Sequence, residues 1–599
     1  MVLRLNQQQR QAVEHDGNAI VTACPGSGKT RVLTARVIRG LADSASSKKH
    51  IVALTFTNRA SDEIKSRLDG LGIEHAGLWA GTIHSFALEW ILRPYAPYDD
   101  RLRYGFRVAD ERYQTKVLDA LRAKHGQTFW FAVNTRMNRE GVCQNPDPTA
   151  DLIAREYREQ LRSERLIDYD EILYHAHRLV SGRPEIAATV GGAIALMCVD
   201  EIQDTQDLQY AILSGICRAA EPAPTIFLVG DSDQCIYESL GAVLKSPEEI
   251  ATEFGLDRIE RLELNGNYRS TQRLIDHYRC LRPCVPEIKS LADYADDWGV
   301  VSFQDKTIPK DDLPAVIAGL IAESLSNGVP ANEICVLAPQ WWHVRAIGRS
   351  LAALLPDVDF DAPGLSPLHG QRENPWFNVA RLLLTTPSAD LFRARSRWAA
   401  EILRDFKETY GRRLPEEVQT PRQLLRVLNS LEPESLDGLQ YLDTAFRLFL
   451  AELGMDLDED EPLQGARDVF FEQAELALDR LGDDAFRDTE YFRKLFRHPS
   501  GIVINTCHGV KGEEYDTVIA FGLLTGYVPN WNEIYNQPPE LGESRASRLL
   551  FVICSRAKRR LHLIAESGRL TNRGWELETT PLLAGIDFEY DPPRAEGRA

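Results

Sequence analysis

The sequence predicts an α/β protein with two mainly parallel sheets. Strands are expected where short apolar runs, rich in β-branched residues, are bounded by turn residues or charges; these runs are 18–22, 51–55, 195–200, 225–230, 334–338, 501–506 and 517–522. Segments with 3.6-residue periodicity, such as 29–41 and 60–71, alternate with the runs, and such alternation is typical of α/β folds. The runs form an early cluster (18–230) and a late cluster (334–565), which indicates two sheets.

Two further stretches have helical periodicity with few strand signals. They are 85–165 and 387–499, and we interpret them as helical insertions, one in each α/β domain. The acidic segment 456–462 is interpreted as a solvated turn. Cys280 and Cys284 are the only closely spaced cysteines, and without a second pair we interpret them as ordinary helix-face thiols rather than a metal site.

Composition bounds the class of protein. A chain of 599 residues is too long for one core. Scattered cysteines, no apolar stretch near the ~18 residues of a membrane span and no signal-like N-terminus predict a cytoplasmic protein without membrane contact. The formal charge of −19 argues against a surface coated with phosphate-binding charge. A local basic groove stays open, because nucleic-acid affinity depends on where Lys and Arg lie.

The stretch IVTACPGSGKTRV places small residues between a predicted strand and a predicted helix. Ala23 stands where the phosphate-loop pattern G-x-x-x-x-G-K-[ST] has its first glycine. The strand–loop–helix context still points backbone N–H groups and a helix N-terminus at an anion. Lys29 can reach β- and γ-phosphates, and the Thr30 hydroxyl can bind Mg²⁺. We therefore predict that the loop binds ATP and Mg²⁺ through Ala23, Cys24, Pro25, Gly26, Ser27, Gly28, Lys29 and Thr30.

Acidic and amide side chains follow two other predicted strands. LMCVDEIQDTQ delivers Asp200 and Glu201 to a strand end, where ligands of open α/β sheets bind. One carboxylate can hold Mg²⁺, a role assigned to Asp200, and the other can orient or deprotonate the attacking water. FLVGDSDQCIY ends in Gln234, which could sense a γ-phosphate, although a polar turn explains its spacing equally well.

Further motifs complete an ordered set: LNQQQ (5–9), TFTNRA (55–60), GTIHSF (81–86), LNGNYRS (264–270), TCHGVKGEEYD (506–516) and RLLFVICSRAKRRL (548–561). With the stretches above, they resemble the helicase motifs of superfamily 1, specifically the UvrD/Rep/PcrA-like group. The resemblance covers nearly the whole chain, from residue 5 to about 560. It implies an ATP hydrolase that moves 3′-to-5′ on single-stranded or partly duplex DNA.

The resemblance also implies an architecture of two RecA-like parallel-sheet P-loop domains, each with a mainly helical insertion. Domain 1A is expected at 1–84 and 166–266, and its insertion 1B at 85–165. Domain 2A is expected at 267–386 and 500–590, and a shortened insertion 2B at 387–499.

Roles around the nucleotide follow from the matched motifs. Gln9 would hydrogen-bond adenine, while Arg31 and Tyr268 would cover the two faces of its ring. Glu514 matches a ribose contact.

Three further residues match groups that act on the γ-phosphate. Gln234 matches a coupling glutamine, and Arg269 and Arg556 match the arginines supplied by the family's second α/β domain. Because an arginine finger stabilises charge on the transferring phosphoryl, hydrolysis would require that domain to close. These three residues, with Lys29, Asp200 and Glu201, form the expected catalytic set.

Contacts to single-stranded DNA are expected from aromatic and small polar residues of the motifs. They are Thr55, Phe56, Thr57, Asn58, Thr82, His84 and His508. Without the family context, Phe56 is equally compatible with a core position.

The chain departs from the family pattern in one motif. The family has Ile-Tyr-x-Trp-Arg-Gly-Ala, whereas this chain has CIYESLGA, with Ser239 and Leu240 in place of tryptophan and arginine. A stacking platform worth roughly 1–3 kcal/mol per base is therefore missing. The departure concerns processive unwinding more than ATP hydrolysis.

Three functions stay open at this point. The first is a translocating helicase of DNA repair, recombination or phage defence. The second is a DNA- or nucleotide-sensing ATPase that regulates a partner nuclease, as in antiviral systems with UvrD-like components such as the B subunit of Gabija. The third, a phosphate-loop kinase or metabolic NTPase, requires the late motifs to be accidental.

Overall fold

The computed structural model divides the chain into two compact units. Unit 1 comprises Met1–Ser302, Val528–Leu561 and Thr580–Ala599, and unit 2 comprises Phe303–Tyr527 and His562–Thr579. The structure describes residues 4–44, 47–109, 111–282, 287–362, 367–368, 374–389, 391–409, 411–412, 414–481, 484–497, 500–536 and 539–592. Cys284 lies outside these residues, and Cys280 is an exposed thiol at the end of a helix.

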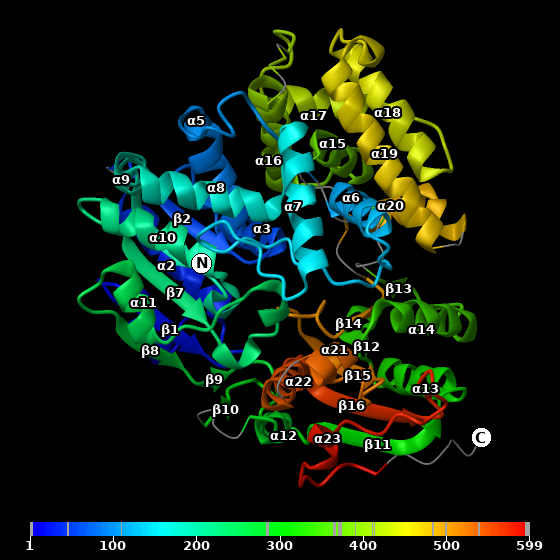
Figure 1. The fold of residues 1–599 in the computed structure, drawn as a ribbon. Helices are drawn as coiled ribbons and strands as arrows, with labels where there is room; N and C mark the ends of the chain where they lie inside the picture. The colour runs from blue at the N-terminus through cyan, green and yellow to red at the C-terminus, as the bar shows by residue number, and fades with distance from the viewer. Residues whose placement is uncertain are drawn as a thin grey trace. The chain divides into compact units, whose positions relative to one another are not determined.

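Unit 1 contains a six-stranded sheet together with the helices that connect its strands (Figure 1). Its strands are β1 (Ala19–Ala23), β2 (His50–Thr55), β3 (Leu78–Thr82), β4 (Arg107–Val108), β5 (Leu166–Ile167), β6 (Ile194–Val199), β7 (Thr225–Gly230), β8 (Glu260–Leu264), β9 (Gly266–Asn267) and β10 (Lys289–Ser290). Its helices are α1 (Gln7–Glu14), α2 (Lys29–Asp43), α3 (Asn58–Gly70), α4 (Ile83–Phe86), α5 (Arg93–Tyr95), α6 (Glu111–Lys124), α7 (Pro148–Ser163), α8 (Tyr169–Gly182), α9 (Pro184–Gly192), α10 (Asp207–Ala219), α11 (Pro247–Phe254), α12 (Gln272–Cys280), α21 (Trp531–Asn536), α22 (Pro539–Cys554) and α23 (Pro581–Ala584).

The large sheet of unit 1 is parallel and has the strand order β3-β2-β6-β7-β1-β8. Its strands are buried on both faces by two separate clusters. In β2, Val52 and Leu54 belong to the cluster formed with α8, α9 and α10, whereas Ile51 and Ala53 belong to the cluster formed with α1, α2 and α3. This alternation follows from the two-residue period of a strand. It explains why the strands read as unbroken apolar runs.

Unit 2 contains a second six-stranded sheet with the order β11-β16-β15-β12-β14-β13. Its strands are β11 (Val300–Pro309), β12 (Ile334–Ala338), β13 (Phe360–Asp361), β14 (Ile502–Thr506), β15 (Tyr515–Phe521) and β16 (Ala557–Ser567), of which β11 and β16 begin in residues assigned to unit 1. The β12 strand pairs in parallel with β14 and β15. The α/β fold class with two sheets is thus confirmed.

The helices of unit 2 form two groups. Helices α13 (Leu313–Ser326) and α14 (Trp341–Leu354) pack on the sheet through a cluster with Ile334 and Ile504. The helices between β13 and β14 share a core of their own, centred on Trp376 and Phe446; they are α15 (Pro375–Leu384), α16 (Phe392–Arg404), α17 (Pro421–Ser430), α18 (Gly438–Glu452), α19 (Glu461–Leu481) and α20 (Thr489–Lys494).

All seven expected strands are found. The β7 and β12 strands have the predicted bounds, and the other five lie within two residues of them. The expected helices at 29–41 and 60–71 are α2 and α3. In the stretch 85–165 the helical prediction is only partly right, because residues 125–147 between α6 and α7 form an irregular loop. No helix among the described residues has the length and apolar character needed to cross a membrane.

Candidate active site

The predicted site residues of unit 1 follow the carboxyl ends of neighbouring strands. Across the sheet, Thr82 ends β3, Thr55 ends β2, Asp200 follows β6, Asp231 follows β7 and Cys24 follows β1. Because the strands are parallel, these positions share one edge of the sheet. Residues predicted to contact DNA therefore lie on β2 and β3, next to the strands that carry the expected ATP residues.

The phosphate loop is held open by hydrogen bonds to its carbonyl groups. Three consecutive carbonyl oxygens accept hydrogen bonds from side chains or backbone outside the loop, while the Ser27 N–H donates within the loop to Cys24 O at 3.3 Å. The bonds run from Asn267 Nδ2 to Pro25 O (2.7 Å), from Tyr268 N to Gly26 O (2.8 Å) and from Gln9 Nε2 to Ser27 O (2.9 Å). The Ser27 hydroxyl is buried and makes no hydrogen bond, as expected of a loop shaped around a polar ligand.

Glycine is required at two positions of this loop. Gly26 and Gly28 have φ values of 67° and 80°, which side chains rarely adopt. A Cβ atom on Gly26 would lie 2.7 Å from Cβ of Arg269. Arg269 is therefore packed directly on the phosphate loop, and Lys29 begins α2 immediately after Gly28.

The first two residues of the loop, Ala23 and Cys24, have structural roles. Ala23 ends β1 and is buried, so the missing glycine of the pattern is accommodated by the strand itself. Burial raises the pKa of the Cys24 thiol to about 12. Cys24 is therefore protonated at neutral pH and serves as a structural residue.

The residues predicted to bind the adenine lie close to the loop. Gln9 is buried in α1, and Asn6, which caps α1, donates a hydrogen bond to the Tyr268 hydroxyl at 2.7 Å. Arg31 is exposed on the first turn of α2. The structure thus brings Gln9 and Tyr268 to one side of the phosphate loop.

The paired carboxylates have a strained backbone. Glu201 has φ 49° and ψ 50°, a left-handed conformation that costs about 1 kcal/mol or more for a residue with a side chain. It is fixed because the Glu201 N–H donates to Asp200 Oδ1 at 3.0 Å and Gln203 Nε2 donates to Glu201 Oε2. Glu201 then faces Lys29, with 3.9 Å between Nζ and Oε2.

The surroundings of Asp200 disfavour its ionised form. Burial, together with the neighbouring Glu201 carboxylate, raises the pKa of Asp200 to about 7, against a smaller opposing effect of Lys29. A bound cation would lower that pKa again. Among the described residues no group of three or more His, Cys, Asp or Glu could hold a metal, so a cation here would take its remaining ligands from phosphates and water.

The two arginines of the expected catalytic set lie in unit 1 beside these groups. Arg556 is buried, and its Nη2 donates to Gln234 Oε1 at 2.8 Å. Gln234 Nε2 in turn donates to Asp231 Oδ2 at 2.6 Å. Arg269 Nη1 donates to the carbonyl oxygen of Ser555 at 2.8 Å. Arg556 is therefore linked through Gln234 to Asp231 at the end of β7, and Arg269 is bonded to the residue that precedes Arg556.

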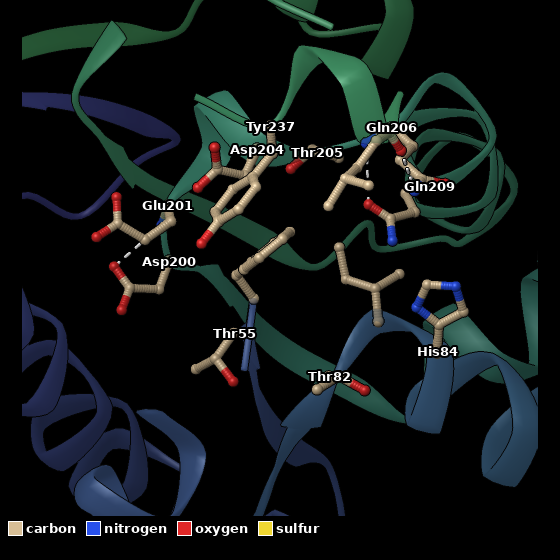
Figure 2. A pocket seen from close by; sticks show the side chains of 13 residues that line it. Thr55, Thr82, His84, Asp200, Glu201, Asp204, Thr205, Gln206, Gln209 and Tyr237 are labelled. Atoms are coloured by element: carbon tan, nitrogen blue, oxygen red, sulfur yellow. Dashed lines mark hydrogen bonds between the residues drawn. The ribbon is translucent and has the colours of Figure 1, made fainter. Parts of the chain in front are cut away.

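A pocket of about 160 Å³ connects the carboxylates to the residues predicted to bind DNA. Figure 2 shows Asp200 and Glu201 toward one end and His84 toward the other. The pocket is lined by Thr55, Phe56, Thr82, Ile83, His84, Asp200, Glu201, Asp204, Thr205, Gln206, Gln209, Tyr237 and Leu240. His84 is only partly buried, but desolvation lowers its pKa to about 4, so His84 is neutral at physiological pH.

Phe56 is neither a core residue nor a free ring. The residue is 38% exposed, and its ring stacks on Tyr237 with 4.8 Å between ring centroids. Thr55 is buried, and its hydroxyl donates to the Thr57 carbonyl at 2.9 Å. Thr57 caps α3, and Asn58 begins that helix; neither lines the pocket. His508 and Glu514 are exposed in unit 2, on the segment between β14 and β15.

The chain is similar in sequence to known proteins of one family. The model of the UvrD/REP helicase N-terminal domain matches residues 5–254. The chain is similar to the ATP-dependent DNA helicase UvrD1 of Mycobacterium tuberculosis, with 26% identity over 93% of this chain and 82% of that protein. It is 25% identical to DNA helicase II of Haemophilus influenzae over 94% of this chain and 84% of that protein. DNA helicase II of Escherichia coli is 32% identical over 45% of this chain and 39% of that protein. Residues 5–254 belong to the UvrD/REP helicase family, and the chain is distantly homologous to UvrD1 and DNA helicase II over most of its length.

As a UvrD-like member of the ATP-dependent DNA helicases, the chain uses ATP and binds DNA. The metabolic NTPase interpretation loses its support. The structure also adds residues to this UvrD-like site that motif matching did not select: Gln203, Asp204, Gln206, Gln209 and Tyr237. All five follow, within ten residues in the sequence, the end of β6 or β7, where acids and an amide were predicted. This closeness in sequence is the signal by which they could have been selected.

Proposed function

We propose that this protein hydrolyses ATP to move 3′-to-5′ along single-stranded DNA, as a translocase or helicase acting in the cytoplasm. One observation carries the proposal: the pocket that contains Asp200 and Glu201 also contains Phe56 and His84. A strand bound over Phe56 would thus lie within one pocket's length of the groups that act on ATP. We further assign residues 1–84 and 166–266 to domain 1A, 85–165 to 1B, 267–386 and 500–590 to 2A, and 387–499 to 2B.

In the proposed reaction, the phosphate loop and Lys29 hold the triphosphate. Glu201 orients and deprotonates the attacking water, since its backbone is fixed beside Lys29. Arg269 and Arg556 stabilise negative charge on the transferring phosphoryl. Gln234 reports the state of the γ-phosphate, because it links Arg556 to Asp231.

The residues present fit a Mg²⁺ ion. Asp200 is buried with its pKa raised to about 7 beside Glu201, which is the charge imbalance that a divalent cation relieves. Asp200 and Thr30 would hold the ion. When bound, Mg²⁺ supplies neutralisation of the phosphate oxygens.

The first test replaces the phosphate-loop lysine. Lys29→Ala is expected to lower ATP turnover by roughly 10²-fold or more, because the transferring phosphoryl loses a preorganised cation. Turnover is measured with and without oligothymidylate, and folding is checked by the unfolding midpoint. Lys116→Ala, on the exposed face of α6, removes the same charge elsewhere and should keep wild-type turnover. Near-normal hydrolysis by the Lys29 variant would reject the assignment.

A second candidate function is favoured by one observation. Leu240 lines the pocket and is 51% exposed, where the family pattern has an arginine. A weaker grip on DNA suits an ATPase that senses DNA or nucleotide and regulates a partner nuclease in phage defence. Strand displacement by the purified protein would favour the helicase. DNA-stimulated hydrolysis without displacement, together with changed activity of an added partner nuclease, would favour the regulatory ATPase.

A further inference from the structure

Arg136 lies against the loop that forms one wall of the pocket. A Cβ atom placed on Gly241 would lie 2.7 Å from Nη1 and 3.2 Å from Cδ of Arg136. Gly241 directly follows Leu240, and Gln206, another lining residue, donates from Nε2 to the Leu240 carbonyl at 2.9 Å. The Arg136 guanidinium is therefore one residue away from the pocket wall.

The backbone around Arg136 is fixed although it lies in the irregular 125–147 loop. Asn134 N donates to Asn145 Oδ1 at 2.8 Å, and Asn145 Nδ2 donates to Asn134 O at 2.9 Å. The carbonyl of Thr135 accepts from Arg158 of α7, and Arg136 N donates to Asn134 Oδ1 at 3.1 Å. The side chain thus starts from a preorganised position, which reduces the entropy lost on binding.

The residues that line the pocket include several acids, so a DNA strand bound there needs a nearby cation. Asp200, Glu201 and Asp204 line the pocket and would repel an anionic strand. Two nearby cations are engaged in ion pairs with acids: Arg139 and Lys245 both contact Asp207 and Glu253. Arg136 itself interacts electrostatically with Asp170.

We propose that Arg136 binds a phosphate of single-stranded DNA at the mouth of this pocket, next to Phe56 and Leu240. Its guanidinium supplies, from the 125–147 loop, a cation beside the position where Leu240 presents none. Gly241 is the complementary element, because its missing side chain and φ of 93° let the arginine lie flat on the backbone. The inference rests on the proposed movement along single-stranded DNA.

The test measures binding of fluorescein-labelled oligothymidylate by anisotropy over about 50–200 mM salt. Arg136→Gln is expected to weaken binding roughly tenfold at the lowest salt, as for a lost charged hydrogen bond. The slope of log K against log salt should shrink by about 0.7, the value for one phosphate contact to a single strand. Arg136→Lys should retain the slope.

Arg155→Gln is the matched control, because Arg155 is exposed on α7 and pairs with Asp151 in the preceding turn. It should keep the wild-type affinity and slope. If Arg136→Gln also keeps both, the inference is overturned while the proposed function stands. If the wild-type protein binds no oligothymidylate, the proposed function itself fails.

Gly241→Ala gives an independent measurement. Its Cβ would displace the Arg136 side chain, so this variant should also weaken binding. In the double variant with Arg136→Gln, the two effects should not add, because both remove the same contact. Fully additive losses would show that Gly241 acts on DNA without Arg136 and would overturn the paired arrangement.

Discussion

The two carboxylates after β6 are maintained at a cost to stability. Asp200 is 6% exposed and lies beside Glu201, whose own backbone is in the left-handed region. Strain and like-charge repulsion of this kind persist where the surrounding fold fixes them and where function uses them. This strain and repulsion fit the roles proposed above for Asp200 and Glu201, a cation site and an oriented water, rather than a role in stability.

Asp200→Asn is expected to stabilise the nucleotide-free protein above neutral pH. The pKa of Asp200 is raised to about 7, from an ordinary value near 4, by burial and by Glu201. The folded state thus holds the Asp200 proton more tightly than the unfolded state. The contribution of the protonated carboxyl to the free energy of unfolding is therefore fully present below pH ~4 and is lost as pH rises through ~7. The asparagine variant avoids that loss, on the order of 3 kcal/mol.

Chemical denaturation of both proteins between about pH 5 and 8 measures this difference. The gap should widen as pH rises and should narrow when Mg²⁺ and a nucleotide are added to the wild type. A gap that is independent of pH would show that Asp200 is already ionised at low pH in the folded protein.

Individual residues differ in how far the sequence reveals them. Lys29, Asp200 and Glu201 are recognisable because phosphate and metal chemistry restrict the residue type at a strand end. Arg136 has no such signal, since its place beside Gly241 depends on the folding of the 104 residues between them. Tyr237 stands within a recognised motif, but only its stacking on Phe56 reveals its position.

At the scale of elements, the loop after β7 is attached to α22 at two points. Arg556, just beyond the end of α22, donates to Gln234, and Glu238 accepts from Arg545 Nε at 2.7 Å and from Arg548 Nη1. Gln234 belongs to the proposed ATP site, whereas Tyr237 and Leu240 of the same loop face the pocket. Movement of α22 with Arg556 would therefore displace the side chains proposed to lie near DNA.

Glu238→Gln tests this attachment. Burial raises the pKa of Glu238, but hydrogen bonds from Arg545 and Arg548 outweigh it, so the net pKa is lowered. The ion pairs of Glu238 therefore stabilise the folded protein above the unfolded-state pKa of Glu, near 4.3. This stabilisation is lost as pH falls through the lower pKa that Glu238 has in the folded protein. The variant should lose about 1–2 kcal/mol of unfolding free energy at neutral pH.

The same variant should hydrolyse ATP with a reduced stimulation by oligothymidylate, because α22 no longer holds the loop. Glu159→Gln, on an exposed position of α7, is the matched control and should change neither quantity. Wild-type stimulation in a destabilised Glu238 variant would limit the ion pair to a structural role.

Strands were predictable where the run is apolar throughout, whereas β8 and β16 were missed because charged residues interrupt or begin them. The β7 strand TIFLVG and the β12 strand ICVLA are unbroken apolar runs. The β8 strand ERLEL alternates buried and exposed residues at an edge of its sheet, and its three charged residues concealed it. The β16 strand begins with AKRR, and because of these charges its first residues were recognised only as part of a motif and not as a strand. Local pattern thus locates uniformly apolar strands better than strands that carry charges.

At the scale of the whole molecule, the chain path could not be obtained from local patterns. Unit 1 is assembled from three separate segments, and the segment Val528–Leu561 returns to it after more than 200 residues in unit 2. That return brings Arg556 to Gln234. The presence of two sheets was predictable from two clusters of apolar runs, whereas the way in which the chain returns depends on long-range packing.

The net charge of the molecule predicts how it meets DNA. With a formal charge of −19, the protein as a whole repels a polyanion at long range, while Arg136 and the phosphate-contacting groups act only at short range. Raising the salt screens the long-range repulsion over a Debye length of about 8–10 Å. The association rate with oligothymidylate should therefore stay constant or rise between about 20 and 150 mM salt, while the dissociation rate increases as ions replace phosphate contacts. Stopped-flow anisotropy separates the two rates. Electrostatically steered association slows steeply with ionic strength. A steep fall in the association rate with salt would therefore mean that a basic surface guides the strand before contact. It would also mean that the acidic residues responsible for the net charge lie far from the path of the DNA.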